Sequence, residues 1–330
     1  MKKRIFAVIM LLSMMLFAGC RGKDNKKDNG RFITDIEYDP TSNSSENSFE
    51  VNPPFFKVTD EKTGAAVYML GSMHVGKPEA VYSQELFDAL DECDTLAVEI
   101  DLIAFENDMA AAVEAVSLLM CPNGTTVRDY MGNDYDRVMQ RFREKGLYNQ
   151  IYEMYIPSLW SSMWSNMMAE ECGYDANYGT DMLLLRYAKQ QGKKIDEIET
   201  AKEQYQVEAD TSPELQMLTL TQTLELTADE MKEQFDLLYD AWKTADMETL
   251  TALATEEEED AGLTEQLKAD YAKYYDDMYT NRQKKMADYV MNKLKTGGKT
   301  FVVVGAMHYA APPSILDVLT ENGYTIEALN

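Results

Sequence analysis

Two apolar runs that end at a glycine lie near opposite ends of this 330-residue chain. Ala66–Leu70 stops at Gly71, and Phe301–Val304 stops at Gly305. Short runs of β-branched, aromatic and aliphatic residues bounded by turn residues predict buried β-strands. Each glycine allows a tight turn at the carboxyl end of its strand. Open α/β sheets collect ligands and catalytic groups at that edge.

The segments around the first run predict a β-hairpin and a β-α-β unit. Residues 56–58 would pair with the first strand across the turn-like segment 60–64. Apolar residues at helical spacing follow over 78–92, and Thr95–Asp101 is an apolar run that ends in acids. Strand, helix and strand in this order predict parallel strands that end at one edge of a sheet.

The rest of the chain is mostly helical in pattern. Apolar side chains recur with periods near 3.6 over four segments, at 103–120, 127–145, 156–171 and 180–191. A short strand is expected at 195–199, and almost continuous helix over 201–295. After Gly297–Gly298 comes the second apolar run, and then a helix over 313–322 and a closing strand over 324–329 are expected.

These elements predict an α/β (α+β) fold with central mixed β-sheets, helices packed around them and a large helical insertion. The insertion, 201–295, lies between the segments with candidate chemistry, so we assign it to lid and scaffold. The sequence contains no glycine fingerprint of a P-loop or dinucleotide site and no Gly-x-Ser-x-Gly elbow. Nucleotide binding and serine hydrolase chemistry are therefore not indicated.

The first residues predict export and a membrane anchor. A basic start precedes the apolar run 5–19, which is shorter than a membrane span of about 20 residues and indicates a signal peptide. Cys20 then follows small residues, as in the lipobox of bacterial lipoproteins, and a plain cleaved signal peptide is the alternative. We expect an extracytoplasmic lipoprotein anchored to the cell membrane. The expected sections are a signal peptide at 1–19, the lipidated cysteine with a polar tether at 20–53, and the folded domain at 54–330.

The charge of the chain bears on its binding partners, and the number of cysteines bears on its disulfides. The chain has 31 Lys and Arg against 57 Asp and Glu, of which 23 and 50 lie in residues 54–330. This acidic surplus repels nucleic acid and argues against a nucleic-acid partner. Apart from Cys20, the cysteines are Cys93, Cys121 and Cys172. One disulfide with a free thiol, or three buried thiols, are both open for this odd number.

The only two histidines of the chain lie in matching frames after the two glycines. Gly71 begins the frame that ends at His74, and Gly305 begins the frame that ends at His308. A lone histidine after a strand is commonly an ordinary buried side chain, but two in one frame indicate a shared site. Glu99 ends its own strand and is expected near His74. Two imidazoles and a carboxylate are sufficient to bind a divalent metal and leave positions for water and substrate.

The ordered set of motifs resembles the TraB/GumN family. The set consists of the two Gly-x-x-His frames, Glu99, the helix opening Gly179-Thr180-Asp181, the strand end Glu197-Ile198-Glu199-Thr200, and Arg282. The resemblance covers roughly residues 55–329. The family includes the Tiki metalloproteases and is similar in fold to erythromycin esterase and the ChaN haem-binding lipoproteins.

The resemblance implies a metal-dependent peptidase acting on a peptide or protein substrate, with manganese, cobalt or zinc as the candidate ion. His74 and His308 match the motif histidines, and Glu99 matches the motif carboxylate as third ligand or general base. The supporting polar positions of the family are matched here by Asp181, Glu199 and Arg282. The two acids would orient the imidazoles, with a helix cap and a surface acid as alternatives. The arginine would pair with a carboxylate or stabilise an oxyanion, or lie on a helix surface.

Other readings stay open. Erythromycin esterase-like relatives hydrolyse esters with His and Glu and no ion, while a binding module would hold haem, a metal or a peptide without chemistry. An interaction protein would interfere with signalling peptides by contact alone. Ser72 is a poor candidate for a nucleophile because no base and orienting group can be assigned around it. The chain also departs from the family pattern, with Gln283 in place of Asn and Ala311 in place of Gly.

Overall fold

The computed structural model describes residues 47–255 and 263–330. Its centre is a six-stranded mixed sheet with the strand order β6-β5-β7-β3-β2-β8, and β1 pairs with β4 in a second, small sheet. The strands are β1 (Phe49–Val51), β2 (Phe55–Thr59), β3 (Ala66–Ser72), β4 (Ala80–Tyr82), β5 (Thr95–Val98), β6 (Lys194–Glu197), β7 (Lys299–Gly305) and β8 (Ile326–Ala328). The predicted α/β class and the hairpin of β2 with β3 are confirmed.

The last long strand, β7, lies in the middle of the sheet. It pairs in parallel with β3 on one side and with β5 on the other. Ser72 of β3 is opposite Gly305, and Val98 of β5 is opposite Val303. All residues of β3 and β5 are buried, as expected for parallel strands covered on both faces. The three carboxyl ends therefore meet at one edge of the sheet.

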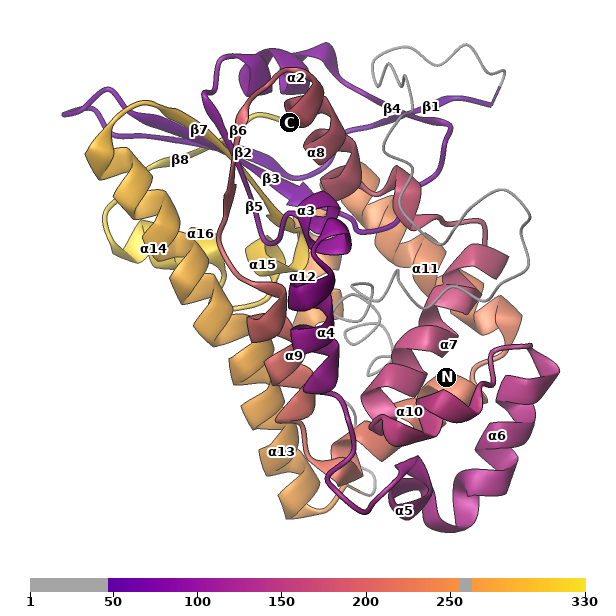
Figure 1. Ribbon diagram of the computed structural model, residues 1–330. Coiled ribbons are helices and arrows are strands. Elements are labelled where there is room, and N and C mark those ends of the chain that lie inside the picture. The colour runs from indigo at the N-terminus through magenta and orange to yellow at the C-terminus, as the bar shows by residue number, and fades with distance from the viewer. Residues whose placement is uncertain (1–46, 256–262) are drawn as a thin grey trace.

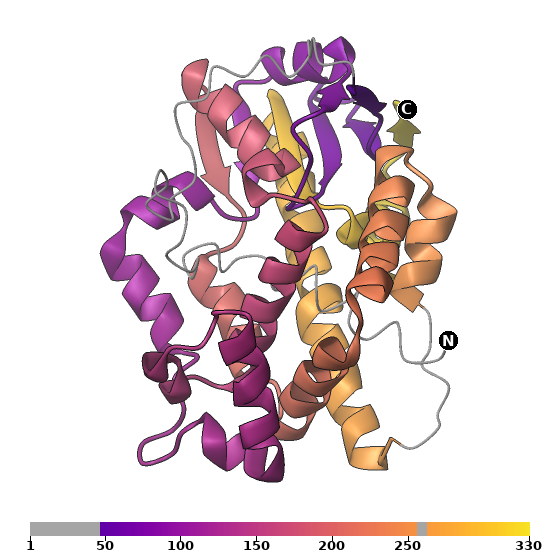
Figure 2. The ribbon, with the colours of Figure 1, turned by 90° about the vertical axis from the view of Figure 1, so that its right-hand side faces the viewer.

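Helices cover both faces of this sheet and extend beyond its carboxyl edge (Figures 1 and 2). The helices are α2 (Gln84–Asp91), α3 (Leu102–Asn107), α4 (Met109–Ser117), α5 (Val127–Met131), α6 (Tyr135–Glu144), α7 (Pro157–Glu171), α8 (Thr180–Gln190), α9 (Ala201–Ala209), α10 (Pro213–Glu225), α11 (Ala228–Lys243), α12 (Met247–Thr255), α13 (Glu265–Tyr275), α14 (Asn281–Thr296), α15 (Met307–Ala310) and α16 (Ile315–Glu321). Helices α14 and α16 form one hydrophobic core with the sheet, and the larger core lies around the other helices.

Polar caps divide or shorten several helices that were predicted as continuous. The prediction of a helix over 103–120 was wrong at Asp108, which ends α3 and accepts hydrogen bonds from the first turn of α4. The helix expected over 127–145 is divided by a 3-10 turn at Gly132–Asp134. The helix expected over 313–322 begins at Ile315 because Ser314 caps it. At Asp108 and Ser314 a short polar side chain binds backbone N–H groups, and the apolar periodicity of the sequence does not reveal such caps. The turn at Gly132–Asp134 has no side-chain cap.

The small sheet was not predicted. Ala80–Tyr82 lies in the segment expected to be the start of a helix, but it forms β4, and the helix α2 begins at Gln84 after its N-cap Ser83. Its partner β1, Phe49–Val51, lies inside the stretch predicted as tether. Val51 and Tyr82 are both buried, so the pairing of the two short strands is supported by the larger core.

Two predictions concern residues outside the described ranges, namely the signal peptide at 1–19 and the lipidation of Cys20. Within 47–255 and 263–330, no helix has the length and apolar character needed to cross a membrane. Cys93, Cys121 and Cys172 are all free thiols. Burial raises the pKa of Cys93 to about 12. The structure therefore has three thiols and no disulfide among them, but only Cys93 is buried, while Cys121 and Cys172 are partly exposed.

A buried acid lies in the helical half of the molecule. Glu208 on α9 is 4% exposed, and the Tyr274 hydroxyl on α13 donates a hydrogen bond of 3.4 Å to it. Burial raises the pKa of Glu208 to about 7, against the opposing effects of Ser158, Tyr274 and the charge of Arg282. In this position the carboxyl group prefers its neutral form.

The variant Glu208→Gln should remove a pH dependence of folding stability. In the native chain Glu208 titrates near pH 7, and a carboxyl with its ordinary pKa of 4.5 titrates lower. Between these values the folded state binds the extra proton, so the free energy of unfolding falls as the pH rises through this window. The shift corresponds to about 3 kcal/mol.

Urea unfolding of the wild type and the variant at about pH 5 and about pH 8 measures this difference. The exposed residue Glu321 on α16 supplies the matched control, Glu321→Gln. Equal pH dependence in the wild type and Glu208→Gln would contradict the prediction.

Candidate active site

A pocket opens where β3, β5 and β7 end. Its empty volume is about 510 Å³, including the part that is open to solvent. Four residues predicted from the sequence line it, namely His74, Glu99, Arg282 and His308. Asp181 and Glu199, two further residues predicted from the sequence, are buried, and they bond to His74 and Arg282 respectively. The structure therefore brings all six side chains together.

The two imidazoles and the carboxylate converge beside Gly305, the last residue of β7. A Cβ atom on this glycine would lie 3.4 Å from Glu99 Oε1, 3.6 Å from His74 Nε2 and 3.8 Å from His308 Cδ2. The backbone N–H of Gly305 also donates to Glu99 Oε1 at 2.6 Å. A side chain at this position would enter the space that the three groups share.

His74 is oriented by the first turn of α8. Asp181 Oδ2 lies 2.8 Å from His74 Nδ1, and Asp181 Oδ1 accepts a hydrogen bond of 2.7 Å from the Ser72 hydroxyl. With Nδ1 held by the carboxylate, Nε2 is the ring nitrogen that remains for the pocket. The predicted orienting role of Asp181 agrees with this contact. Ser72 is occupied as a hydrogen-bond donor.

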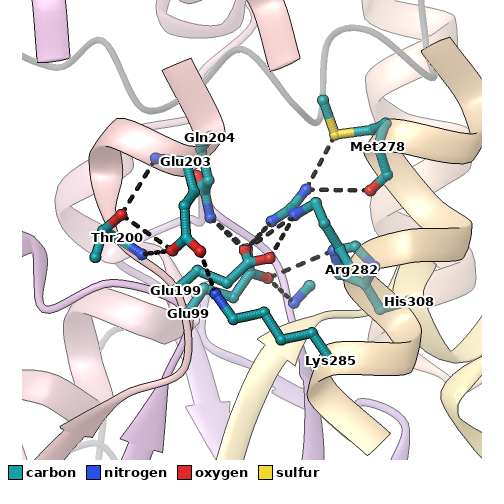
Figure 3. Close-up of polar contacts among 10 residues, drawn as sticks. Glu99, Glu199, Thr200, Glu203, Gln204, Met278, Arg282, Lys285 and His308 are labelled. Atoms are coloured by element: carbon teal, nitrogen blue, oxygen red, sulfur yellow. Dashed lines mark hydrogen bonds and ion pairs between the residues drawn. The ribbon is translucent and has the colours of Figure 1, made fainter. Parts of the chain in front are cut away.

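An arginine between two glutamates forms the opposite wall (Figure 3). Arg282 binds Glu199 through three N–H···O contacts of 2.8 to 3.0 Å, and its Nη2 lies 2.7 Å from Glu99 Oε2. The Gln204 side chain on α9 bridges the same two carboxylates, at 3.1 and 3.0 Å. Arg282 and Glu199 are thus neither a free helix-surface arginine nor a surface acid. Gln204 was not predicted, since a glutamine in an amphipathic helix carries no distinguishing signal.

A π-helix, η5 (Asp276–Thr280), carries two further residues to the pocket. Met278 and Tyr279 line it, and the Tyr279 ring centroid lies 5.8 Å from that of His308. The Met278 carbonyl accepts a hydrogen bond of 3.3 Å from Arg282 Nη1. Single π-helical turns are found frequently at functional sites. The sequence predicted continuous helix here, because one widened turn leaves the apolar period almost unchanged.

Burial and neighbouring charges shift the pKa values of the two histidines in opposite directions. Burial alone would lower the pKa of His74, but the charge and hydrogen bond of Asp181 outweigh it and raise the pKa to about 9. Burial and the charge of Arg282 lower the pKa of His308 to about 3. Burial would raise the pKa of Glu99, but Arg282 and the imidazoles lower it to about 2. At neutral pH the pocket thus contains a charged His74, a neutral His308 and an ionised Glu99.

The chemistry of this donor set fits a divalent cation. Three buried carboxylates, Asp181, Glu99 and Glu199, face one guanidinium, which leaves two negative charges when both imidazoles are neutral. His308 Nδ1 is buried and has no hydrogen-bond partner among the described residues. The groups are not preassembled, since His308 Nε2 and Glu99 Oε1 are 3.9 Å apart. Within the described ranges no group of three His, Cys, Asp or Glu residues is arranged to hold an ion.

The two departures from the family pattern are in contact with each other. Gln283 is fully buried, and its side-chain Nε2 donates a hydrogen bond of 3.0 Å to the Ala311 carbonyl. This bond links α14, which carries Arg282, to the end of α15, which carries His308. Gln283 and Ala311 therefore connect α14 with the end of α15.

Comparison with known proteins agrees with the resemblance seen in the motifs. The model of the TraB/PrgY/gumN family matches residues 54–328. No curated protein and no solved structure gives a significant match. The matched range contains every described residue of the pocket.

The ¹⁵N resonances of the two histidines test the electrostatics of the site. In metal-free protein near neutral pH, His74 should be an imidazolium and His308 a neutral imidazole, with His308→Ala assigning the signals. In the variant Asp181→Asn, burial acts on His74 against only the weaker charge of Glu99, which the charge of Arg282 counters. Its pKa should then fall below the ordinary value of about 6.5. A His74 ring that stays charged at neutral pH in Asp181→Asn would refute this account.

Proposed function

Because this chain belongs to the TraB/PrgY/gumN family, we propose that it is a metal-dependent hydrolase that cleaves peptide bonds. We further propose that it works outside the cytoplasm, held at the cell membrane by lipid on Cys20. The observation that supports the activity is the convergence of His74, Glu99 and His308 beside Gly305, at the mouth of one pocket.

His74, His308 and Glu99 are the proposed ligands. A divalent ion bound by them would polarise the scissile carbonyl and bring the pKa of its bound water towards about 7. A carboxylate whose pKa is about 2 is a weak base, which favours the ligand role for Glu99 over that of general base. Asp181 fixes the ring of His74 by its contact at Nδ1.

Arg282 and Tyr279 have different parts in this proposal. The guanidinium of Arg282 is engaged by Glu99, Glu199 and the Met278 carbonyl, so it acts by keeping Glu99 ionised. Tyr279 lines the pocket, and burial raises the pKa of its phenol. The hydroxyl therefore stays protonated and can donate to an oxygen on which negative charge develops.

A metal-independent hydrolase is the second candidate. It is favoured by the lack, within the described ranges, of three side chains arranged around an ion. In this version the His74 Nε2 would accept a proton from water only once the ring has lost its own proton, which its pKa of about 9 places in alkaline solution, and Asp181 would stabilise the imidazolium that results. The raised pKa of His74 shows that this pair favours the charged ring.

Elemental analysis of protein purified without chelator tests the metal site. The wild type should carry one equivalent of manganese, cobalt or zinc, and His74→Ala and His308→Ala should lose it. Removal of an outer partner typically weakens metal binding about 10- to 100-fold, so Glu99→Gln, which removes a ligand charge, should weaken it by more than about 100-fold. The matched control is Glu203→Gln, since Glu203 pairs with Lys285 at the surface of α9.

Hydrolysis of a quenched fluorescent peptide library, with each metal added back to chelated protein, tests the activity. Turnover that needs the metal and is lost in the three pocket variants supports the proposal. Turnover by metal-free protein would establish the second candidate. Retention of metal or peptide without any cleavage would show a binding protein.

A further inference from the structure

A buried arginine lies behind the turn that carries His74. Arg186 on α8 is 6% exposed, and both of its hydrogen bonds end on Asn177, at 2.6 Å to the main-chain oxygen and 3.4 Å to Oδ1. Its Nε atom has no partner among the described residues. Burial lowers the pKa of Arg186 against weaker opposing charges. The guanidinium is thus retained in the interior with incomplete hydrogen bonding.

The buried charge of this residue is not in itself favourable for stability. Removing a charge from water is costly, and the hydrogen bonds to Asn177 offset that cost only in part. What the guanidinium does is local: it holds Asn177 in the short helix η4 (Ala176–Tyr178). Asn177 is 2% exposed and is part of the chain that leads directly into α8 and Asp181.

The segment 175–181 interlocks with the turn 73–76. Gly76 and Asp175 exchange two backbone hydrogen bonds, of 3.0 and 2.9 Å, and the N–H of Thr180 donates to the Met73 carbonyl at 2.8 Å. A Cβ on Gly76 would lie 2.0 Å from the main-chain carbonyl oxygen of Tyr178. The two backbones are therefore in direct contact, with no room for a side chain between them.

Contact on the other side of the turn is equally close. A Cβ on Gly179 would lie 2.4 Å from the carbonyl oxygen of His74. A displacement of η4 would therefore move the backbone of His74, and it would also move Asp181 at the start of α8. Both determinants of the imidazole position, its backbone and its Nδ1 partner, depend on the same segment.

We propose that Arg186 is a positioning residue for His74. Through Asn177 it fixes the segment 175–181, which in turn sets the His74 backbone and holds Asp181 against the ring. The effect on catalysis rests on the proposed hydrolase function, whereas the effect on the imidazole is a property of the fold. The two can therefore be measured separately.

The test compares Arg186→Met with Arg186→Lys, which keeps the charge but loses the planar fork. The first readout is the ¹H resonance of the His74 Nδ1–H in metal-free protein, assigned with His74→Ala. It should be sharp and slowly exchanging in the wild type, lost in Arg186→Met and partly restored in Arg186→Lys. The control is Arg137→Met, because Arg137 pairs with Asp134 on the exposed side of α6 and should leave the signal unchanged.

The second readouts separate positioning from folding. Arg186→Met should unfold at a temperature close to that of the wild type, because relief of the buried charge offsets the donor that Asn177 loses. Its kcat should fall about 100-fold, as small displacements of a catalytic group do, with KM changed less than about threefold. Loss of the resonance at unchanged unfolding temperature supports the proposal even if the wild type shows no hydrolysis, which would refute only the proposed function.

Two results would overturn the proposal. One is a wild-type Nδ1–H signal in Arg186→Met, which would show that the segment 175–181 holds its place without the guanidinium. The other is loss of the signal together with a collapse of the unfolding temperature in both variants, which would make Arg186 a residue of general stability. If Arg186→Met alone fails to fold, the signal of Arg186→Lys decides, because a fully wild-type signal there also contradicts the need for the fork.

Discussion

The pocket depends on the parallel pairing of β7 between β3 and β5. Each of these strands ends at the same edge, and each delivers one of the groups that converge there: His74 after β3, Glu99 after β5 and His308 after β7. The register that sets Ser72 opposite Gly305 also sets the distance between the two histidine turns. A slip by one residue would turn the side chains of β7 to the wrong face and separate the imidazoles.

Electrostatic balance is the second requirement of this arrangement. Glu99 and Glu199 are both buried, and burial without a partner would raise the pKa of Glu99. Arg282 prevents this by binding both, and Gln204 completes their hydrogen bonding. The Gln283 to Ala311 bond then ties the helix of Arg282 to the helix of His308. The sheet thus sets where the groups lie, and the helical half sets their charge.

Much of this could be predicted from the sequence, because strong local signals carry it. Apolar runs that stop at glycine gave the central strands, and the repeated Gly-x-x-His frame gave the histidines. Residues whose importance arises only from tertiary contact could not be found in this way. Gln204 and Tyr279 look like ordinary members of amphipathic helices, and the π-helical turn that presents Tyr279 does not disturb the apolar period. Helix ends set by a single cap, as at Asp108, were missed for a related reason.

The position of β7 in the sheet affects how the chain can fold during its synthesis. The strand at the middle of the sheet, residues 299–305, comes after the whole helical section, so a growing polypeptide has β3 and β5 long before it has the strand that joins them. Contacts between such distant segments form late, because a long loop must close first. Until β7 has been made, the nascent protein thus has neither a finished central sheet nor both histidine turns.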